Sequence, residues 1–364
     1  IFLQRHPNGA PALGALAPLE HEGMPLTLDN ADDAPRLGVG KPEDLSWKAL
    51  LDVHTCTECN RCQELCPAWN TGKPLSPRKV ITGLRDGVPT TDDELWACTN
   101  CGACVEQCPV DIEHIDHVAN LRRYRVLEES QFPSELTGMF KNLEVKGNPW
   151  GRNKKDRMAW VTKAQKEGID VPVLKPGDSA EKYDYLLWVG CAGSLDDHGV
   201  KTSRALVELL NVAGVSFAVL DHETCTGDPA RRAGNEFLFQ QLAQENIDNL
   251  NAAGVKTIIT SCAHCFNTFS NEYPDFGGNY RVLHHTQLLN RLVRDGKLKP
   301  VPRGPEHRER ITYHDPCFLG RHNKVFDPPR ELLEATGTEL AEMPHNKNEA
   351  FCCGAGGARM FMEE

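Results

Sequence analysis

No apolar run in this sequence reaches the roughly 20 residues that a membrane-spanning helix needs, and no signal peptide is visible. Basic residues are in the minority, because 40 Lys and Arg face 51 Asp and Glu, which gives a formal net charge of −11. That balance argues against a nucleic-acid partner, which would require a basic surface. The sequence also lacks a nucleotide-binding loop, a Ser-His-Asp grouping and a flavin fingerprint, so its chemistry has to come from other residues.

Cysteine, by contrast, is abundant, with fifteen residues. An odd number does not fit a framework made of disulfides alone. The short, regular spacings between these cysteines are typical of metal ligands in a reducing compartment. We therefore predict metal centres, and a location in the cytoplasm or on the cytoplasmic face of a membrane.

Composition and periodicity divide the chain into five segments. Residues 1–45 are rich in Pro, Gly and Ala without a sustained period, which predicts an extended lead-in. Residues 46–130 carry helical patterns around two groups of cysteines, and residues 131–182 are typical of a linker with short helices. Two cysteine-rich repeats follow, at 183–308 and 309–364. The chain begins with Ile1, and we expect it to be cut from a longer sequence at both ends.

Two short stretches in the second segment repeat one spacing. "CTECNRCQELCP" and "CTNCGACVEQCP" both follow C-x2-C-x2-C-x3-C-P, offset by 42 positions. In this spacing three thiolates hold one [4Fe–4S] cluster, and the fourth reaches the neighbouring cluster. We assign Cys56, Cys59, Cys62 and Cys108 to cluster 1, and Cys66, Cys98, Cys101 and Cys104 to cluster 2. Structural zinc or disulfides are the alternatives, which the duplicated pattern of eight cysteines disfavours.

The long gap between Cys66 and Cys98 includes "SPRKVITGLRDG", which predicts a helix. This region therefore resembles the α-helical ferredoxin domain of respiratory iron–sulfur subunits more than the compact, β-rich ferredoxins. Two neighbouring clusters conduct electrons but do not by themselves catalyse a reaction. The chain needs a donor and an acceptor.

From residue 183 onwards, short apolar runs alternate with amphipathic helices. The runs "YDYLLWVGC", "VSFAVLDHETC", "VKTIITSC" and "RITYHDPC" predict buried strands, each ending near a cysteine. Strands that alternate with helices form a largely parallel sheet, and ligands bind beyond its carboxyl edge. The predicted fold class is therefore α+β with several domains: an α-helical two-cluster ferredoxin domain, then α/β domains with cysteines at the carboxyl ends of strands.

The cysteines of this half form a second internal repeat. In each copy a strand leads to one cysteine, a helix follows, and a second cysteine precedes a turn: 33 residues separate Cys191 from Cys225, and 34 separate Cys317 from Cys352. The first copy adds a Cys-x-x-Cys motif at Cys262 and Cys265. The same offset would place the corresponding pair of the second copy near position 389, so we expect its last ligands to lie beyond this sequence.

These motifs resemble the cysteine-rich "CCG" domain of heterodisulfide reductase and its relatives. With the helical ferredoxin domain in front, residues 46–364 resemble the D-type subunit of that family. The stretches "CTGDPARRAGNE", "HCFNTFSNEYP" and "HDPCFLGRHN" are most similar to a branch linked to electron-transfer flavoprotein. The resemblance implies that this flavoprotein is the electron donor. It also implies a preceding membrane domain with haem b, a menaquinone or ubiquinone pool as acceptor, and a place on the cytoplasmic face of the cell membrane.

In the family, a motif of five cysteines holds a non-cubane [4Fe–4S] cluster in which the adjacent pair bridges irons. By this resemblance Cys317, Cys352 and Cys353 supply three of the five ligands of the second site. The first copy departs from the pattern, because Thr226 stands where the second adjacent cysteine belongs. Its four thiols predict an ordinary or degenerate cluster, or none: Cys191, Cys225, Cys262 and Cys265.

Several neighbouring residues could support these clusters. Glycines allow left-handed turns whose N–H groups point at cluster sulfurs, and we expect this of Gly354, Gly356 and Gly357. Arginines could offset the negative charge of a cluster or simply pair with Asp228 or Glu236, and both alternatives are open for Arg231 and Arg232. For three histidines a structural role, at the surface or in the core, is favoured over a role in the site: His54, His284 and His285. A proton relay is conceivable for His314 and Asp315, which precede Cys317.

The sequence therefore predicts an iron–sulfur oxidoreductase that passes electrons from reduced electron-transfer flavoprotein towards a membrane quinone. No residue is assigned a catalytic role. The direction of electron flow stays open, because cluster potentials span about −700 to +450 mV. The alternatives are a reductase that cleaves a disulfide on a non-cubane cluster, the iron–sulfur subunit of a glycolate or lactate oxidase, and a structural metal scaffold.

Overall fold

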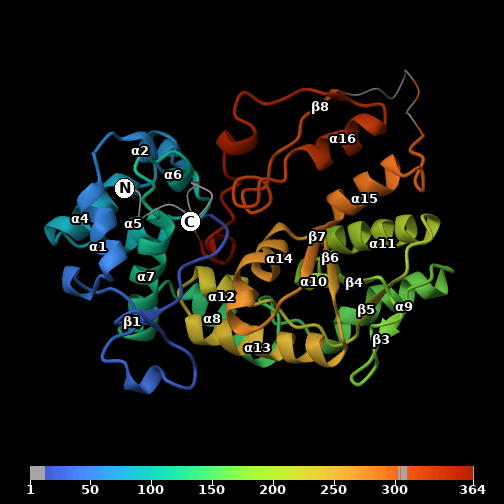
Figure 1. The fold of residues 1–364 in the computed structure, drawn as a ribbon, viewed down its shortest axis with the longest axis horizontal. Coiled ribbons are helices and arrows are strands. Elements are labelled where there is room, and N and C mark those ends of the chain that lie inside the picture. The colour runs from blue at the N-terminus through green and yellow to red at the C-terminus, as the bar shows by residue number, and fades with distance from the viewer. Residues whose placement is uncertain (1–12, 302–303, 305–309, 364) are drawn as a thin grey trace.

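The computed structural model describes residues 13–301, 304 and 310–363. Figure 1 shows a mainly helical N-terminal part, in blue to teal, beside a part built on a parallel sheet, in green to orange. The last segment, in red, passes above the sheet part and returns to the helical part, so that the C-terminal end lies near the N-terminal helices (Figure 1). The chain thus brings its last cysteines back towards its first ones.

The helical part consists of short helices that begin at polar capping residues or at the cysteine loops. The Ser46 hydroxyl accepts a hydrogen bond from Ala49 N at the start of the first helix, and Ser76 does the same for Lys79 N at the fourth. This fourth helix is the one expected between Cys66 and Cys98. The helices are α1 (Trp47–Thr55), α2 (Arg61–Glu64), α3 (Pro67–Asn70), α4 (Pro77–Asp86), α5 (Asp92–Trp96), α6 (Ala103–Glu106) and α7 (His114–Leu127).

The second part is a five-stranded sheet in which all neighbouring strands are parallel, in the order β3-β5-β4-β6-β7. The strands are short and apolar, as expected where helices cover both faces of a parallel sheet. They are β3 (Val173–Leu174), β4 (Tyr185–Trp188), β5 (Phe217–Leu220), β6 (Thr257–Thr260) and β7 (Arg281–His284). The predicted combination of a helical ferredoxin part with an α/β part is confirmed.

Alternate side chains of each strand enter one of two apolar cores. Leu186 of β4 and Ile258 of β6 pack with α13 and α8 on one face, whereas Leu187 and Ile259 pack with α11, α9 and α15 on the other. The helices of this part are α8 (Glu135–Lys146), α9 (Ala159–Lys166), α10 (Gly190–Leu195), α11 (Asp197–Val212), α12 (Asp228–Arg232), α13 (Glu236–Ala252), α14 (Ala263–Asn267) and α15 (His285–Arg294).

The strand expected in "RITYHDPC" is where the prediction was wrong. β8 (Arg310–Ile311) covers only two residues and pairs with β9 (Glu339–Leu340), outside the five-stranded sheet. Cys317 therefore lies in a loop. Pro316 cannot donate a ladder hydrogen bond, and the Asp315 carboxylate binds Arg330 from α16 (Asp327–Ala335), so this stretch folds as a loop instead of a strand.

Two segments expected to be peripheral pack tightly. In the lead-in, Leu16 and Leu19 are each 1% exposed, and a two-residue hairpin joins β1 (Glu20–His21) to β2 (Met24–Pro25). The segment 131–182, expected to be a linker, contributes α8, α9 and edge strand β3 to the sheet part. Short 3₁₀ or π turns complete the described chain: Ala31–Asp33, Pro42–Asp44, Lys154–Met158, Thr268–Glu272, Tyr273–Phe276, Lys347–Glu349 and Arg359–Phe361.

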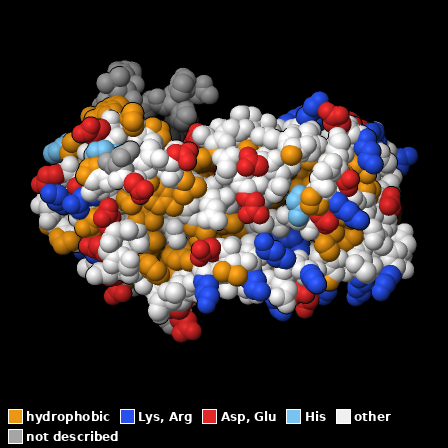
Figure 2. Space-filling model, turned by 90° about the horizontal axis from the view of Figure 1, so that it is seen from below, with side chains coloured by type: hydrophobic (Ala, Val, Ile, Leu, Met, Phe, Trp, Pro, Cys, Tyr) orange, Lys and Arg blue, Asp and Glu red, His pale blue; other side chains and the backbone are white. Residues whose placement is uncertain are grey.

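The surface differs between the two parts. Figure 2, seen from below, shows hydrophobic side chains gathered over the left half of this face, whereas Lys and Arg lie mainly on the right half. Within the part of the chain that the structure describes, no helix is both long and apolar enough to span a bilayer.

Candidate iron–sulfur sites

Eight cysteines line two small cavities in the helical part. One cavity is lined by Cys56, Cys59, Cys62 and Cys108, and the other by Cys66, Cys98, Cys101 and Cys104. Three thiols of each cavity come from one run, and the fourth comes from the other run. The structure thus brings together the two sets of thiols that the spacing assigned to cluster 1 and cluster 2.

The backbone of the two runs repeats along with the sequence. Glu58 and Asn100 hold equivalent positions and have φ angles of 54° and 52°, and Asn60 and Gly102 have φ angles of 66° and 73°. These left-handed turns curl each loop around its cavity. As a result Asn100 N donates a hydrogen bond to Cys98 Sγ at 3.4 Å, the kind of contact that offsets the charge of cluster sulfur.

The thiols fit a four-iron cluster chemically. Four sulfurs facing one cavity are the donor set that [4Fe–4S] clusters use. Burial raises the pKa of the Cys62 and Cys66 thiols to about 12, so iron must displace their protons on binding. Cys59 is exposed, so cluster 1 lies nearer to solvent, whereas the four thiols assigned to cluster 2 are all buried.

The second cysteine-rich site, formed by Cys317, Cys352 and Cys353, lies directly against a cysteine assigned to cluster 2. Cys101, a predicted cluster 2 ligand, packs against Cys317 and Cys352 in one buried cluster. Cys352 Sγ also lies 3.4 Å from Thr99 Oγ1. Residues more than 200 positions apart in the chain therefore form one continuous group of sulfurs.

Buried polar side chains hold this junction in place. Arg321 is 2% exposed and donates to the carbonyl oxygens of Cys101, at 2.9 Å, and of Asn348 and Ala350. Gly356 lies so close to cluster 2 that a Cβ atom would be 2.4 Å from Thr99 O. Sequence reasoning gave no role to Arg321, although it lies in a stretch that carried the family resemblance.

Arg122 of α7 is a second residue that the sequence did not point to. Its guanidinium is fully buried and donates to Leu95 O at 2.9 Å and Cys98 O at 2.7 Å in the helical part. It also donates to Arg232 O at 2.8 Å in the first repeat and Gly357 O at 3.0 Å in the second. One side chain therefore joins the loop that carries Cys98 to both repeats.

The first cysteine-rich site, formed by Cys191, Cys225, Cys262 and Cys265, follows the carboxyl ends of β4, β5 and β6. It shares a cavity of about 450 Å³ with the second site, and this shared cavity is lined by all seven of these cysteines. Thr226 also lines it, with its hydroxyl 3.9 Å from Cys265 Sγ. Cys225, and then Arg157, lower the pKa of the Cys191 thiol to about 6.

The residues expected to support the clusters divide into two groups. Gly354, at φ 86°, has its N atom 3.4 Å from Cys352 Sγ, and Gly357 is also left-handed. The prediction was wrong for Gly356, which does not have a positive φ angle. Arg231 and Arg232 instead pair with carboxylates: Arg231 lies 3.5 Å from Glu236, and Arg232 lies 3.0 Å from Asp228. Both also pair with Glu272, and neither lines the shared cavity. The ion-pair alternative therefore describes both arginines.

The histidine candidates lie mostly away from the sulfurs. His54 is exposed, and burial lowers the pKa of His284 to about 3 and of His285 to about 4, which leaves both rings neutral. His314 does line the shared cavity, with Nε2 2.8 Å from Phe351 O. The Asp315 carboxylate forms an ion pair with Arg330. His264, which sequence reasoning passed over, lines the cavity and pairs with Asp228 at 2.9 Å.

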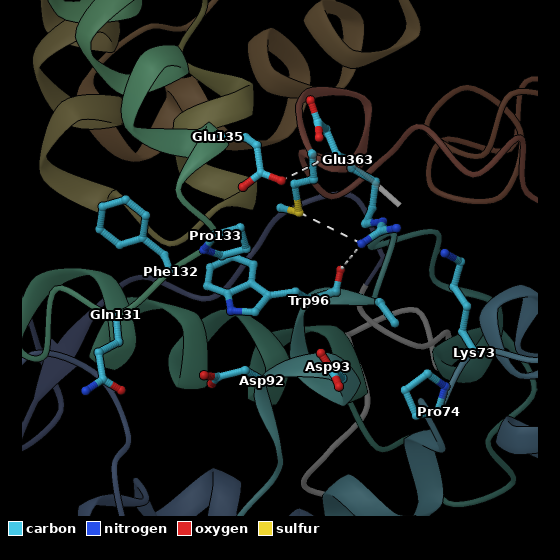
Figure 3. Close-up of a pocket in the computed structure, with 13 residues that line it drawn as sticks. Lys73, Pro74, Asp92, Asp93, Trp96, Gln131, Phe132, Pro133, Glu135 and Glu363 are labelled. Carbon is cyan, nitrogen blue, oxygen red and sulfur yellow. Dashed lines mark hydrogen bonds between the residues drawn. The ribbon is translucent and has the colours of Figure 1, made fainter.

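A larger cavity, of about 630 Å³, lies between α5, the start of α8 and the C-terminal segment. Figure 3 shows Trp96, Glu135 and Glu363 on its walls, with Asp92 and Lys73 at its edges. No cysteine lines it, and its hydrogen bonds tie the chain together, as between Glu363 N and Glu135 Oε1 at 3.2 Å. The candidate chemistry lies with the sulfurs, not in this cavity.

Comparison with protein-family models agrees with this geometry. A 4Fe-4S dicluster domain matches residues 55–112, and a cysteine-rich domain matches residues 185–270 and 311–364. No solved structure matches the chain.

Several curated proteins are similar in sequence. The "Probable iron-sulfur-binding oxidoreductase FadF" of Bacillus subtilis is 40% identical over 95% of this chain and 56% of its own length. The "EtfAB:quinone oxidoreductase" of Syntrophomonas wolfei is 40% identical over 92% of this chain and 52% of its own length. The D-type heterodisulfide reductase subunit of Methanosarcina barkeri is 29% identical over 86% of this chain and 81% of its own length. The chain thus spans a little over half the length of the first two relatives.

Proposed function

Because this chain belongs to the iron–sulfur oxidoreductases that join a 4Fe-4S dicluster domain to cysteine-rich domains, we propose that it carries electrons from a reduced electron-transfer flavoprotein towards a membrane quinone. The name of the Syntrophomonas wolfei relative supports this donor and this acceptor. In this proposal haem b and the quinone site belong to a membrane domain, and the described residues lie on the cytoplasmic face. A non-cubane [4Fe–4S] cluster at the second site completes the set.

The observation that carries the proposal is the packing of Cys101 against Cys317 and Cys352 in one buried cluster. It makes cluster 2 and the second site neighbours, with no other residue between their ligands. Cluster 1 stands at the exposed end of this row, where Cys59 meets solvent. Electrons can therefore enter or leave at cluster 1 and reach the second site through cluster 2.

The residues of this chain have three tasks along that row. The thiols hold the clusters, which supply one-electron storage when bound. Backbone N–H groups, such as those of Asn100 and Gly354, donate to sulfur and offset negative charge. Arg122 and Arg321 fix the cysteine loops to one another by binding their carbonyl oxygens, so that the spacing between centres does not drift.

Reduction of a disulfide substrate is the second candidate function. It is favoured by the shared cavity, because seven cysteines of two sites face one space and Cys353 is exposed there. The likeness to the heterodisulfide reductase of Methanosarcina barkeri points the same way. Thr226 counts against this chemistry at the first site, since a threonine hydroxyl cannot take the place of a bridging thiolate.

Electron paramagnetic resonance (EPR) of the full-length protein, prepared without oxygen, separates the two candidates. The proposal predicts that reduced electron-transfer flavoprotein generates the signals of reduced clusters and that a quinone analogue removes them. If neither reagent changes the EPR signals, but a thiol or a disulfide does, the protein would be a disulfide reductase instead.

A further inference from the structure

A buried arginine that belongs to no sequence motif contacts a cysteine of the first cysteine-rich site. We infer that Arg157 is a positioning residue that holds the Cys191 thiolate by a charged hydrogen bond and thereby raises the reduction potential of a cluster at that site. This inference rests on the proposed function, because it requires that the first site binds a cluster.

The guanidinium of Arg157 contacts the sulfur directly. Arg157 lies in the 3₁₀ turn Lys154–Met158, within the segment expected to be a linker, and is 5% exposed. Its Nη2 donates to Cys191 Sγ at 3.2 Å, and its Nη1 donates to Ser194 Oγ at 3.2 Å. A planar guanidinium held on two sides cannot turn away from the sulfur.

Glu223 accepts hydrogen bonds both from Arg157 and from the backbone that leads into Cys191. It is 5% exposed, accepts from Arg157 Nη1 at 3.4 Å, and accepts from the N–H groups of Val189 and Gly190 at 2.9 Å each. Glu223 thus fixes both the guanidinium and the backbone that leads into Cys191. The guanidinium therefore acts on the sulfur through both its nearby positive charge and its direct hydrogen bond.

The described residues of the second repeat lack the counterparts of Glu223, of the Gly190 N–H and of Ser194. Glu223 lies two residues before Cys225, and Ala350 occupies the equivalent place before Cys352. Gly190 corresponds to Pro316, which has no N–H to donate, and Ser194 corresponds to Gly320. Arg321 of the second repeat donates to carbonyl oxygens and not to sulfur.

The two differences of the first repeat act in the same direction. Thr226 removes a thiolate, which removes negative charge, and Arg157 adds a positively charged donor to one of the four remaining sulfurs. Both changes favour the reduced, more negative form of a cluster, since hydrogen bonds to sulfur and net charge set cluster potentials. The first site should therefore hold an electron more tightly than it would without Arg157.

The test is a redox titration of the full-length protein with dithionite, followed by EPR. The first-site signal is identified as the one lost in Cys262→Ala. We expect Arg157→Gln to lower the equilibrium constant for one-electron reduction of this site about tenfold, which corresponds to a reduction potential about 59 mV lower. Arg157→Lys, which keeps a positive donor, should shift it less. The control is Lys155→Gln, which removes the same charge from an exposed neighbour in the same turn.

Each result decides the matter. Suppose that Arg157→Gln retains its first-site iron and that its potential shifts no further than the potential of Lys155→Gln. The role of Arg157 is then overturned, and the proposed function is unaffected. If Arg157→Gln loses its first-site iron, the potential of Arg157→Lys decides. A fall of less than about 59 mV supports the inference, and a fall of that size or more, although a positive donor is retained, overturns it. If the unsubstituted protein shows no first-site signal, the first site binds no cluster and the inference fails. Electron transfer from flavoprotein to quinone through the other clusters is measured separately, so the proposed function can hold in that case.

Discussion

The two cysteine-rich repeats share the order of their cysteines but occupy different structural settings. In the first repeat the cysteines follow strands of the parallel sheet, and a buried arginine donates to one of the sulfurs. In the second repeat the cysteines lie in loops, and two of the thiols touch a predicted ligand of cluster 2. A repeat in sequence therefore does not imply an equal place in the structure. The second site adjoins the cysteines assigned to cluster 2, and the first site faces the second across the shared cavity.

Cutting the contact at Cys101 should have the largest effect. Cys101→Ala removes a ligand of cluster 2 and the thiol that touches Cys317 and Cys352, so reduction of the second site through cluster 1 should stop. The measurement is freeze-quench EPR after mixing with reduced flavoprotein. The matched control is Cys191→Ala in the first repeat, which should leave reduction of the second site intact. If both variants slow the reduction of the second site equally, the two repeats do not differ in their connection to cluster 2.

Arg122 binds both repeats, so its loss should affect them together. Arg122→Met leaves several buried carbonyl oxygens without a donor, at a cost of about 1–3 kcal/mol each. We expect the free energy of unfolding to fall by about 3 kcal/mol or more, measured by anaerobic denaturation. Arg125→Met on the same helix removes a partly exposed ion pair with Glu129 and should cost at most about 1 kcal/mol. Equal losses in the two variants would show that Arg122 does not join the parts.

Restoring the missing thiolate should have the smallest effect on stability and a clear effect on the spectrum. Thr226→Cys gives the first site five thiols, as the family motif requires, and we expect its EPR signal to approach that of the second site. The hydroxyl group of Thr226 is already 3.9 Å from Cys265 Sγ, so the new sulfur would lie among the others. Thr226→Ser, which keeps the hydroxyl, is the control. An unchanged spectrum in Thr226→Cys would mean that more than one thiolate separates the two sites.

Local sequence predicted much of this molecule. The C-x2-C-x2-C-x3-C-P runs anticipated which thiols share a cavity, because short loops with left-handed turns bring three thiols of one run together and the duplicated spacing assigns the fourth to the other run. The strands leading to Cys191, Cys225 and Cys262 followed from short apolar runs. The roles of Arg122, Arg157 and Arg321 did not, since each depends on partners 22 to 235 positions away, and single arginines carry no periodic signal. The failed strand before Cys317 has a local cause, because Pro316 and the Asp315–Arg330 pair favour a loop.

The contact between cluster 2 and the second cysteine-rich site is tested most directly by the EPR spectrum of the fully reduced full-length protein. The structure predicts magnetic coupling between these two centres, seen as broadened or split signals that become simple when Cys101→Ala removes one partner. A fully reduced spectrum that equals the sum of isolated, non-interacting centres would contradict the account.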